Sequence, residues 1–285
     1  MISCSAIQYS CNTNKRENSE KAEHFIRASA ADGASIIALQ ELYNTTYFCR
    51  EIDQKYFDWS EPIPGPTTER FSALAAELGV VLLIPFFEKH APGVYYNSMV
   101  VFNVDGSILG KYRKMHIPDD PGFYEKYYFT PGDKGFTVFD TPFGRIGTLI
   151  CWDQWFPEAA RMAALQGAEI LFYPTAIGTL PEETDLDKAQ FLDAWKTIQK
   201  SHAIANGCFV VSINRTGEEG GTRFWGNSFI TGPFGEELAI AGEDEGFILA
   251  DIDLTSIEKH RQTWPFFRDR RIDAYKHLNK RFMDL

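Results

Sequence analysis

The stretch TLICWDQWFPEAARMAALQGAEI, from Thr148 to Ile170, decides the fold class. An apolar run ends at Cys151, and an irregular segment with two tryptophans, an aspartate and a proline follows it. Because proline suits the first turn of a helix, we predict a helix from about Pro157 to Gln166. The next apolar run, EILFYPTA, predicts a second strand. A strand, a helix and a strand in succession indicate an α/β fold.

The same alternation continues in both directions from this stretch. Strands are predicted over residues 2–9, 35–41, 80–90, 97–106, 107–118, 169–176, 208–217, 225–235, 237–242 and 246–254, with a hairpin over 136–153 that turns at 142–144. Helices are predicted over 18–33, over 64–79 with Thr67 or Thr68 as its cap, over 187–206 with Thr184 or Asp185 as its cap, and after 254. We therefore expect one α/β domain over residues 1–285, with helices covering mixed sheets. A basic and aromatic tail over about 262–285 is expected to dock on this domain or on a partner subunit.

The composition narrows the class of protein. The net charge is -11 over 285 residues, which argues against a nucleic-acid partner because a binder of phosphates usually carries a basic surface. The five cysteines are odd in number and include no CxxC pair, so neither a disulfide framework nor a zinc site is expected. No segment is apolar for long enough to cross a membrane, and the first residues lack the pattern of a signal peptide. We expect a cytoplasmic protein without a membrane partner.

Three polar side chains lie where an apolar strand is predicted to end. They are Glu41 after SIIALQ, Lys114 in KYRKMHIPDDPG and Cys151 after RIGTLI. Taken singly, each has an ordinary interpretation, as a surface carboxylate, a solvated cation and a small buried apolar residue. Strand ends in α/β folds converge on a pocket, however. Together the three side chains supply a general base, a cation that stabilises an oxyanion, and a nucleophile.

The thiol of Cys151 needs activation, because a free cysteine has a pKa of about 8.5 and is mostly protonated at neutral pH. Glu41, Lys114 and the N-terminus of the following helix are all expected to favour the thiolate. A turn from strand to helix is also expected to aim backbone N–H groups, notably that of Trp152, at the space in front of the sulfur.

Long segments of the chain resemble the carbon–nitrogen hydrolase family, also called the nitrilase family. These segments are LQELY, KYRKMHIPDDPGFYEKYYFTPGD, RIGTLICWDQWFPEAARMAALQGAEIL, YPTAIG, FVVSINRTG and FWGNSFITGPFGE, and the similarity covers essentially the whole chain. The resemblance implies a four-layer α-β-β-α sandwich that forms homodimers or larger homo-oligomers. It implies a Glu-Lys-Cys triad at Glu41, Lys114 and Cys151, with Glu125 holding Lys114 and helping to position the substrate. It also implies a covalent thiol amidohydrolase that needs no metal and no organic cofactor.

Within the family, the segment CWDQWFPE is most similar to the N-carbamoylputrescine amidases. Relatives that cleave N-carbamoyl-D-amino acids have arginines three and four residues after the cysteine, where they clamp a carboxylate. This chain has Gln154 and Trp155 at those positions. A small carbamoyl compound with an uncharged or cationic tail is therefore expected. The predicted substrate is N-carbamoylputrescine, which yields putrescine, carbon dioxide and ammonia in polyamine biosynthesis.

Five residues are candidates for contact with the substrate tail. Trp152 and Trp155 can pack an aliphatic chain or face an ammonium, or they are core or dimer-contact aromatics. Asp153, Glu182 and Glu183 are candidates to bind the far amine. The last two lie in a polar loop directly before a predicted helix, where acidic residues are common without any role in binding.

Three alternatives remain open from the sequence. Another amidase of the family, of the β-ureidopropionase or ω-amidase type, would keep the triad and bind a carboxylate with an arginine from elsewhere, such as Arg50 or Arg215. A magnesium-dependent phosphodiesterase or phosphatase with a similar sandwich would use Glu41 as a metal ligand, but the chain lacks the terminal Ser-Asp-His segment of that class. A non-catalytic scaffold is disfavoured by the intact Glu-Lys-Cys set.

Overall fold

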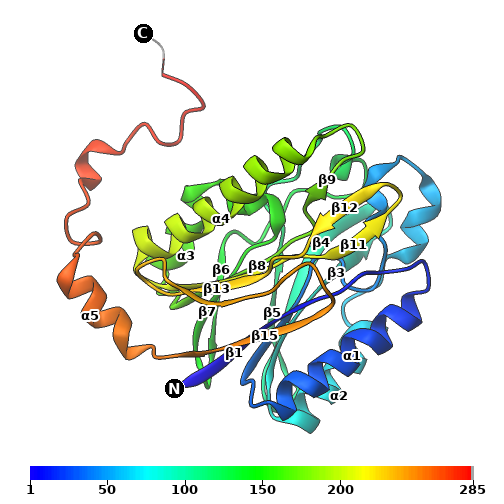
Figure 1. Ribbon diagram of the computed structural model, residues 1–285, viewed down its shortest axis with the longest axis horizontal. Helices are drawn as coiled ribbons and strands as arrows, with labels where there is room; N and C mark the ends of the chain where they lie inside the picture. Colours follow the sequence, from blue (N-terminus) through cyan, green and yellow to red (C-terminus); the bar gives the residue numbers. More distant parts are fainter. Residues whose placement is uncertain (284–285) are drawn as a thin grey trace.

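Two six-stranded sheets packed face to face form the centre of the molecule, and helices cover both outer faces (Figure 1). The computed structural model describes residues 1–283. Helices α1 and α2 lie on one outer face, and α3 and α4 lie on the other. The chain therefore forms the four-layer α-β-β-α sandwich, as predicted.

The strands of the first sheet come from the N-terminal part of the chain and from one strand near its end. In spatial order they are β15 (Gly246–Ile252), β1 (Ile2–Gln8), β2 (Ile36–Leu39), β3 (Val81–Ala91), β4 (Val94–Phe102) and β5 (Ile108–Arg113). The second sheet contains β14 (Glu237–Ile240), β13 (Phe229–Thr231), β10 (Phe209–Ile213), β8 (Ile170–Pro174), β7 (Gly144–Thr148) and β6 (Thr137–Thr141). A small third sheet joins β11 (Thr216–Glu219), β12 (Thr222–Trp225) and β9 (Gly178–Thr179). The predicted hairpin is confirmed as β6 and β7, in which Thr141 pairs with Gly144.

Central strands of the first sheet are buried on both faces. Along β2, Ile36 and Ala38 pack in the core shared with the second sheet, whereas Ile37 and Leu39 pack in the core beneath α1 and α2. Strands β3 and β4 repeat this alternation. Successive side chains of a strand point to opposite faces, so a strand covered on both sides must be apolar throughout.

The helices are α1 (Lys15–Ala31), α2 (Pro66–Leu78), α3 (Pro157–Leu165), α4 (Asp185–Asn206) and α5 (Thr255–Thr263), with 3₁₀ helices at Phe48–Arg50, Gln54–Trp59, Glu125–Tyr127, Cys151–Trp155 and Ile272–Ala274. Thr184 caps α4, which confirms one of the two predicted caps. The cap predicted for α2 is wrong: Gly65 is the N-cap, and Thr68 instead accepts a hydrogen bond from the Gly65 N–H at 2.7 Å. Pro66 starts that helix because its missing N–H would have no partner there.

The direction of the strands brings three polar residues to strand ends. Strand β5 runs in the same direction as β2 and β3, because β4 is antiparallel to both of its neighbours. In the second sheet, β7, β8 and β10 are parallel to one another. Glu41 follows β2, Lys114 follows β5, and Cys151 follows β7. The first sheet thus supplies two of these side chains and the second sheet supplies the third.

The C-terminal tail leaves the sandwich after α5 and leads away from it in Figure 1. Its first part touches the domain: the Phe267 ring lies 4.9 Å from the guanidinium of Arg161 and 4.7 Å from that of Arg261. Docking on a partner subunit stays a prediction, and residues 284–285 of the predicted tail lie outside the described part of the chain.

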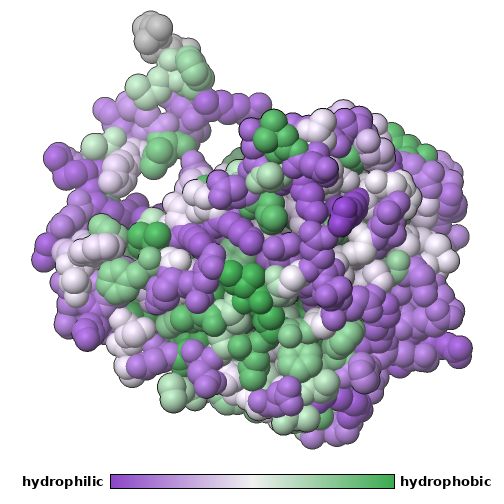
Figure 2. Space-filling view, viewed as in Figure 1, coloured by the Kyte–Doolittle hydropathy of each residue, from purple (hydrophilic) through white to green (hydrophobic). Residues whose placement is uncertain are grey.

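Figure 2 shows apolar side chains gathered over the region of β13, β14 and β15, with polar side chains around them. Phe234, Leu238 and Ile240 are exposed in this region. None of the helices in residues 1–283 has the length and apolar character needed to cross a membrane.

Candidate active site

Glu41, Lys114 and Glu125 meet in a buried ion-pair network. The Lys114 Nζ donates to Glu41 Oε1 at 2.8 Å and to Glu125 Oε2 at 2.7 Å, and none of the three side chains is exposed. An ammonium has three N–H groups, so one remains for a ligand. The structure therefore brings together three of the residues predicted from the sequence.

One carboxylate oxygen of Glu41 is held and the other is free. Asn97 on β4 donates from Nδ2 to Glu41 Oε1 at 2.7 Å, on the same oxygen that Lys114 contacts. Glu41 Oε2 is buried and has no hydrogen-bond partner among the described residues. Arg215 supports the backbone here by donating to the carbonyl oxygens of Glu41 at 3.0 Å and Leu42 at 2.9 Å. The carboxylate is thus fixed with Oε2 available to accept a proton.

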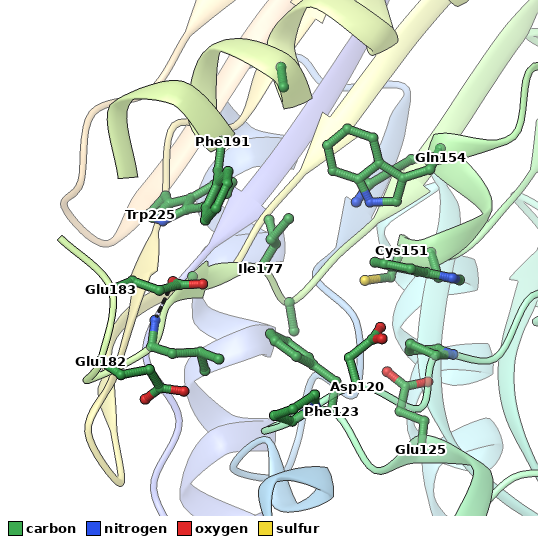
Figure 3. A pocket seen from close by; sticks show the side chains of 18 residues that line it. Asp120, Phe123, Glu125, Cys151, Gln154, Ile177, Glu182, Glu183, Phe191 and Trp225 are labelled. Carbon is green, nitrogen blue, oxygen red and sulfur yellow. Dashed lines mark hydrogen bonds between the residues drawn. The ribbon is translucent and has the colours of Figure 1, made fainter. Parts of the chain in front are cut away.

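Cys151 occupies a strained turn. Its φ is +43°, in the left-handed region that costs a residue other than glycine roughly 1–3 kcal/mol. The residue begins the 3₁₀ helix η4 (Cys151–Trp155) just after β7, and α3 begins at Pro157 as predicted. Because η4 stands between them, the N-terminus of α3 does not directly follow the sulfur. Figure 3 shows the sulfur directed into a cavity.

The pKa of the Cys151 thiol lies well above its usual value, so its surroundings as a whole disfavour the thiolate; of the two side chains predicted to favour it, Lys114 lowers the pKa whereas Glu41 raises it. Burial is the largest cause, and the negative charge of Glu41 adds to it. The Lys114 ammonium and the backbone N–H of Ala176 lower the pKa, but not enough to compensate. The resting thiol is therefore protonated, and its attack on a substrate requires transfer of the proton to a base.

Burial and neighbouring charges together shift the pKa values of Lys114 and Glu125. Burial disfavours the Lys114 ammonium, but the charges of Glu125 and Glu41 hold its pKa well above the usual value. Burial raises the pKa of Glu125 to about 7, and Glu41 adds to this rise, whereas Lys114 and Tyr47 lower it. Tyr47 donates its hydroxyl to Glu125 Oε1 at 2.7 Å. Two carboxylates around one ammonium carry excess negative charge, so Glu125 keeps its proton up to near-neutral pH.

Asp153 does not line the cavity, and its prediction as a ligand for the substrate amine is wrong. Its carboxylate is fully buried and accepts hydrogen bonds from Tyr112 Oη, from Ile150 N, and from both the backbone N and the Nδ1 of His116. Four donors already occupy the two oxygens, which leaves no lone pair aimed at a substrate.

The residues next to Asp153 in the sequence, unlike Asp153 itself, line the cavity. Trp152 and Trp155 both line the cavity, as predicted. Gln154 also lines the cavity, and its buried side chain is held by several hydrogen bonds. Its Oε1 accepts hydrogen bonds from the side chains of Thr175, Trp195 and Gln199. These contacts connect the turn of Cys151 to the end of β8 and to α4.

The cavity in front of the sulfur has a volume of about 480 Å³. In Figure 3, Cys151 and Glu125 lie on one side of it, and Glu182 and Glu183 lie across from them. Glu183 Oε2 accepts a hydrogen bond from the Leu180 N–H at 2.7 Å, whereas no side-chain partner of Glu182 lies in the described part of the chain. The apolar wall consists of residues such as Phe123, Trp155, Ile177, Phe191 and Trp225.

Every charged side chain that lines this cavity, within residues 1–283, is acidic. The four are Asp120, Glu125, Glu182 and Glu183. The sequence did not single out Asp120, although it lies in the PDDPG loop only six residues after Lys114. Figure 3 shows that it projects into the cavity between Phe123 and Cys151.

The two arginines considered for a carboxylate substrate do not line the cavity. Arg215 is fully buried and pairs with Glu219 at 2.7 Å, besides its contacts to the backbone after β2. Arg50 contacts the backbone oxygens of Glu219 and Gly220. Both guanidinium groups therefore have structural partners elsewhere.

No group of three or more His, Cys, Asp or Glu side chains in the described chain is arranged to hold a metal ion. Glu41, which a magnesium-dependent enzyme of this shape would use as a ligand, contacts the Lys114 ammonium instead. The observed partners of Glu41 thus fit amide chemistry with a lysine cation.

Known proteins resemble this chain over almost all of its length. Residues 4–262 match the carbon–nitrogen hydrolase family. The chain is 47% identical to an N-carbamoylputrescine amidase of Solanum lycopersicum over 98% of this chain and 95% of that protein. It is 42% identical to a citrullinase of Francisella tularensis over 99% of each. The crystal structure of a carbon–nitrogen hydrolase from Helicobacter pylori G27 is 46% identical, covers 99% of both chains and superposes with a TM-score of 0.96. The chain belongs to the carbon–nitrogen hydrolase family.

Proposed function

We propose that this enzyme hydrolyses N-carbamoylputrescine to putrescine, carbon dioxide and ammonia. The acidic lining of the cavity carries this proposal, because Asp120, Glu182 and Glu183 are suited to an ammonium tail and no lysine or arginine among the described residues lines the cavity. A substrate with a carboxylate would lose its hydration there without gaining a cationic partner.

Acylation uses the network around Glu41. The Cys151 sulfur attacks the carbamoyl carbon while its proton moves to Glu41 Oε2, the oxygen that Asn97 and Lys114 leave free. The third N–H of Lys114 and the backbone N–H of Trp152 hold the oxyanion. When the carbonyl re-forms, the C–N bond breaks and Glu41 returns the proton to the leaving nitrogen.

Deacylation uses the same residues with water as the nucleophile. Glu41 takes a proton from water as the water oxygen attacks the thioester-type carbon. The C–S bond then breaks, and the sulfur regains a proton from Glu41. The carbamic acid that is released loses carbon dioxide and gives the second nitrogen product. Either nitrogen can leave first, and the sum is one diamine, one carbon dioxide and one ammonia for each substrate and water.

Citrulline is the competing substrate that the relatives suggest, since a citrullinase is 42% identical to this chain. It has the same carbamoyl group, but its tail carries an α-carboxylate besides the α-ammonium. That carboxylate would lie in a cavity lined by Asp120, Glu182 and Glu183. Repulsion between this carboxylate and the acidic side chains disfavours the citrulline complex, so N-carbamoylputrescine is the better fit.

The test is ammonia release from four carbamoyl compounds that differ only in the tail. They are N-carbamoylputrescine, n-butylurea, which is the same chain without the terminal amine, citrulline and N-carbamoyl-β-alanine, with Cys151→Ala as the control for contaminating activity. We expect kcat/KM for N-carbamoylputrescine to exceed that for n-butylurea by about tenfold or more, which corresponds to a single ionic contact of about 1.4 kcal/mol. Preference for citrulline or for N-carbamoyl-β-alanine would refute the assignment of a cationic tail and leave the Cys151 chemistry in place.

We also propose that the enzyme forms a homodimer or a larger homo-oligomer. The exposed Phe234, Leu238 and Ile240 and the aromatic tail support this proposal. Light scattering on the eluting peak of a size-exclusion column tests it directly, and a monomer at working concentration would contradict it.

A further inference from the structure

Asp153 links the two chain segments that carry the nucleophile and the catalytic cation. Its Oδ2 accepts from Ile150 N at 2.9 Å and from Tyr112 Oη at 2.7 Å. Its Oδ1 accepts from His116 N at 3.0 Å and from His116 Nδ1 at 2.7 Å, with Nδ1 carrying the hydrogen. Ile150 directly precedes Cys151, and Tyr112 and His116 flank Lys114 on both sides.

We propose that Asp153 is a positioning residue that fixes where the Cys151 sulfur lies relative to the Lys114 ammonium. This inference rests on the proposed roles of Cys151 and Lys114 in amide hydrolysis. The side chain touches neither the cavity nor a substrate, so any effect on the rate must act through the two segments that it joins.

The link spans the interface between the two sheets. Lys114 follows β5 in the first sheet, and Cys151 follows β7 in the second sheet. Two sheets that pack through apolar side chains have contacts without strong directionality. Hydrogen bonds to an ionised carboxylate are directional and roughly twice as strong as neutral ones, and Asp153 is fully buried where water does not compete. The carboxylate therefore fixes the position of one segment relative to the other at the place where the two catalytic groups meet.

The strained turn at Cys151 explains why such a tether is required. A residue at φ +43° relaxes unless the surrounding structure holds it. The Ile150 N–H bond to Asp153 holds the residue immediately before the turn, and the Gln154 carbonyl accepts from His202 Nε2 at 2.7 Å on the other side. A shift of the sulfur by about 1 Å can cost on the order of 10²-fold in rate.

Asparagine at this position breaks one of the two tethers whichever way its amide turns. With the NH₂ group toward His116, the backbone N–H of His116 faces another donor. With the NH₂ group toward Ile150, the backbone N–H of Ile150 does so. Tyr112 Oη and His116 Nδ1 can each adapt by accepting a hydrogen bond, but a backbone N–H cannot. The side-chain volume is unchanged, so the variant isolates the loss of a tether from the loss of packing.

The experiment compares Asp153→Asn with Glu61→Gln as a matched control. Glu61 is another largely buried carboxylate with several donors, from Lys15, Asn44 and the Thr67 N–H, but it lies beside α1 and α2 and does not line the cavity. We expect D153N to lower kcat by roughly 10- to 100-fold with KM changed less than about threefold, whereas E61Q keeps both. Tyr112→Phe removes a single donor to Asp153 and is expected to lower kcat in the same direction by a smaller factor, which keeps the test informative if D153N fails to fold.

A second readout does not depend on the substrate. The rate at which iodoacetamide alkylates Cys151 is measured against pH in the folded wild type, D153N, Y112F and E61Q, since the Lys114 ammonium lowers the pKa of this thiol. Loosening the link changes the distance of the sulfur from both Lys114, which lowers this pKa, and Glu41, which raises it, so the midpoint of the profile is expected to shift in D153N but not in E61Q. If N-carbamoylputrescine is not hydrolysed by the wild type, the proposed function fails while this comparison still decides the role of Asp153. Folded D153N and Y112F with wild-type midpoints, or with wild-type kcat on a substrate that turns over, would overturn the inference, as would an equal loss in E61Q.

Discussion

Replacement of Glu125 by glutamine is expected to change how the free energy of unfolding depends on pH. Burial raises the pKa of Glu125 from 4.5 to about 7 in the folded chain. Between these two values, the folded state holds a proton that the unfolded state has released, so the wild type loses stability as the pH rises. Above about pH 7, the ionised Glu125 of the folded chain costs roughly 3 kcal/mol relative to the unfolded chain. Glutamine cannot ionise and is free of this cost.

The assay is equilibrium urea unfolding of both proteins at several pH values from about 5 to 8. The stability of E125Q minus that of the wild type is expected to rise by about 2–3 kcal/mol across this range. Its absolute value includes the altered hydrogen bonds to Lys114 and Tyr47, but that offset does not vary with pH.

Glu88→Gln is the matched control. Glu88 is also a buried carboxylate, but Arg113, Lys111 and Ser98 overcome the effect of burial and lower its pKa. A group with a lowered pKa loses its stabilising contribution only as the pH falls below about 4.5. The difference between E88Q and the wild type should therefore be constant from about pH 5 to 8. A difference that is equally flat for E125Q would refute the idea that Glu125 is held protonated beside Glu41 and Lys114.

Three further predictions follow from the site. Asn97→Ala removes the 2.7 Å hydrogen bond to Glu41 Oε1. Because only the orientation of the base is lost, kcat in a steady-state assay is expected to fall by roughly 10- to 100-fold with KM almost unchanged. An unchanged kcat would contradict this role of Asn97. The double variant Glu182→Gln with Glu183→Gln is expected to raise KM for N-carbamoylputrescine by about tenfold or more and to leave n-butylurea unaffected, so a parallel change in both substrates would argue against contact with the ammonium. Incubation with a chelator should leave the rate unchanged whereas iodoacetamide abolishes it, since Lys114 polarises the carbonyl and Cys151 is the nucleophile; loss of activity with the chelator alone would point to a metal.

The layers of the fold were predictable because each depends on local pattern. The apolar run before Cys151, the proline at position 157 and the turn at 142–144 are signals within a few residues, and the elements that they indicate are present. The cap of α2 differs from the prediction because two threonines follow Gly65 and Pro66 in the sequence, and hydroxyl groups are the commoner caps. The positions of Glu41, Lys114 and Cys151 at strand ends followed from the same local reasoning.

Partners distant in sequence account for what was missed. Asn97 lies 56 residues from Glu41, and Tyr47 lies 78 residues from Glu125, so no local spacing indicates either hydrogen bond. The closeness of Asp153 to the nucleophile in the sequence suggests a ligand of the substrate, yet its partners Tyr112 and His116 lie about 40 residues earlier in the chain. The raised pKa of Cys151 likewise depends on burial, which no motif encodes.

The order of the strands has a consequence for synthesis on the ribosome. Strand β1 pairs on one edge with β2 and on its other edge with β15, in a register that runs from Ile2 opposite Ile252 to Gln8 opposite Gly246. The outer edge of β1, the first strand to be synthesised, therefore stays uncovered until β15 has been synthesised. An unpaired edge on an apolar strand is a template for association between chains. Nascent chains of this protein, and any product truncated before Gly246, should thus depend on chaperones until β15 closes the sheet, although every strand at the active site has by then been made.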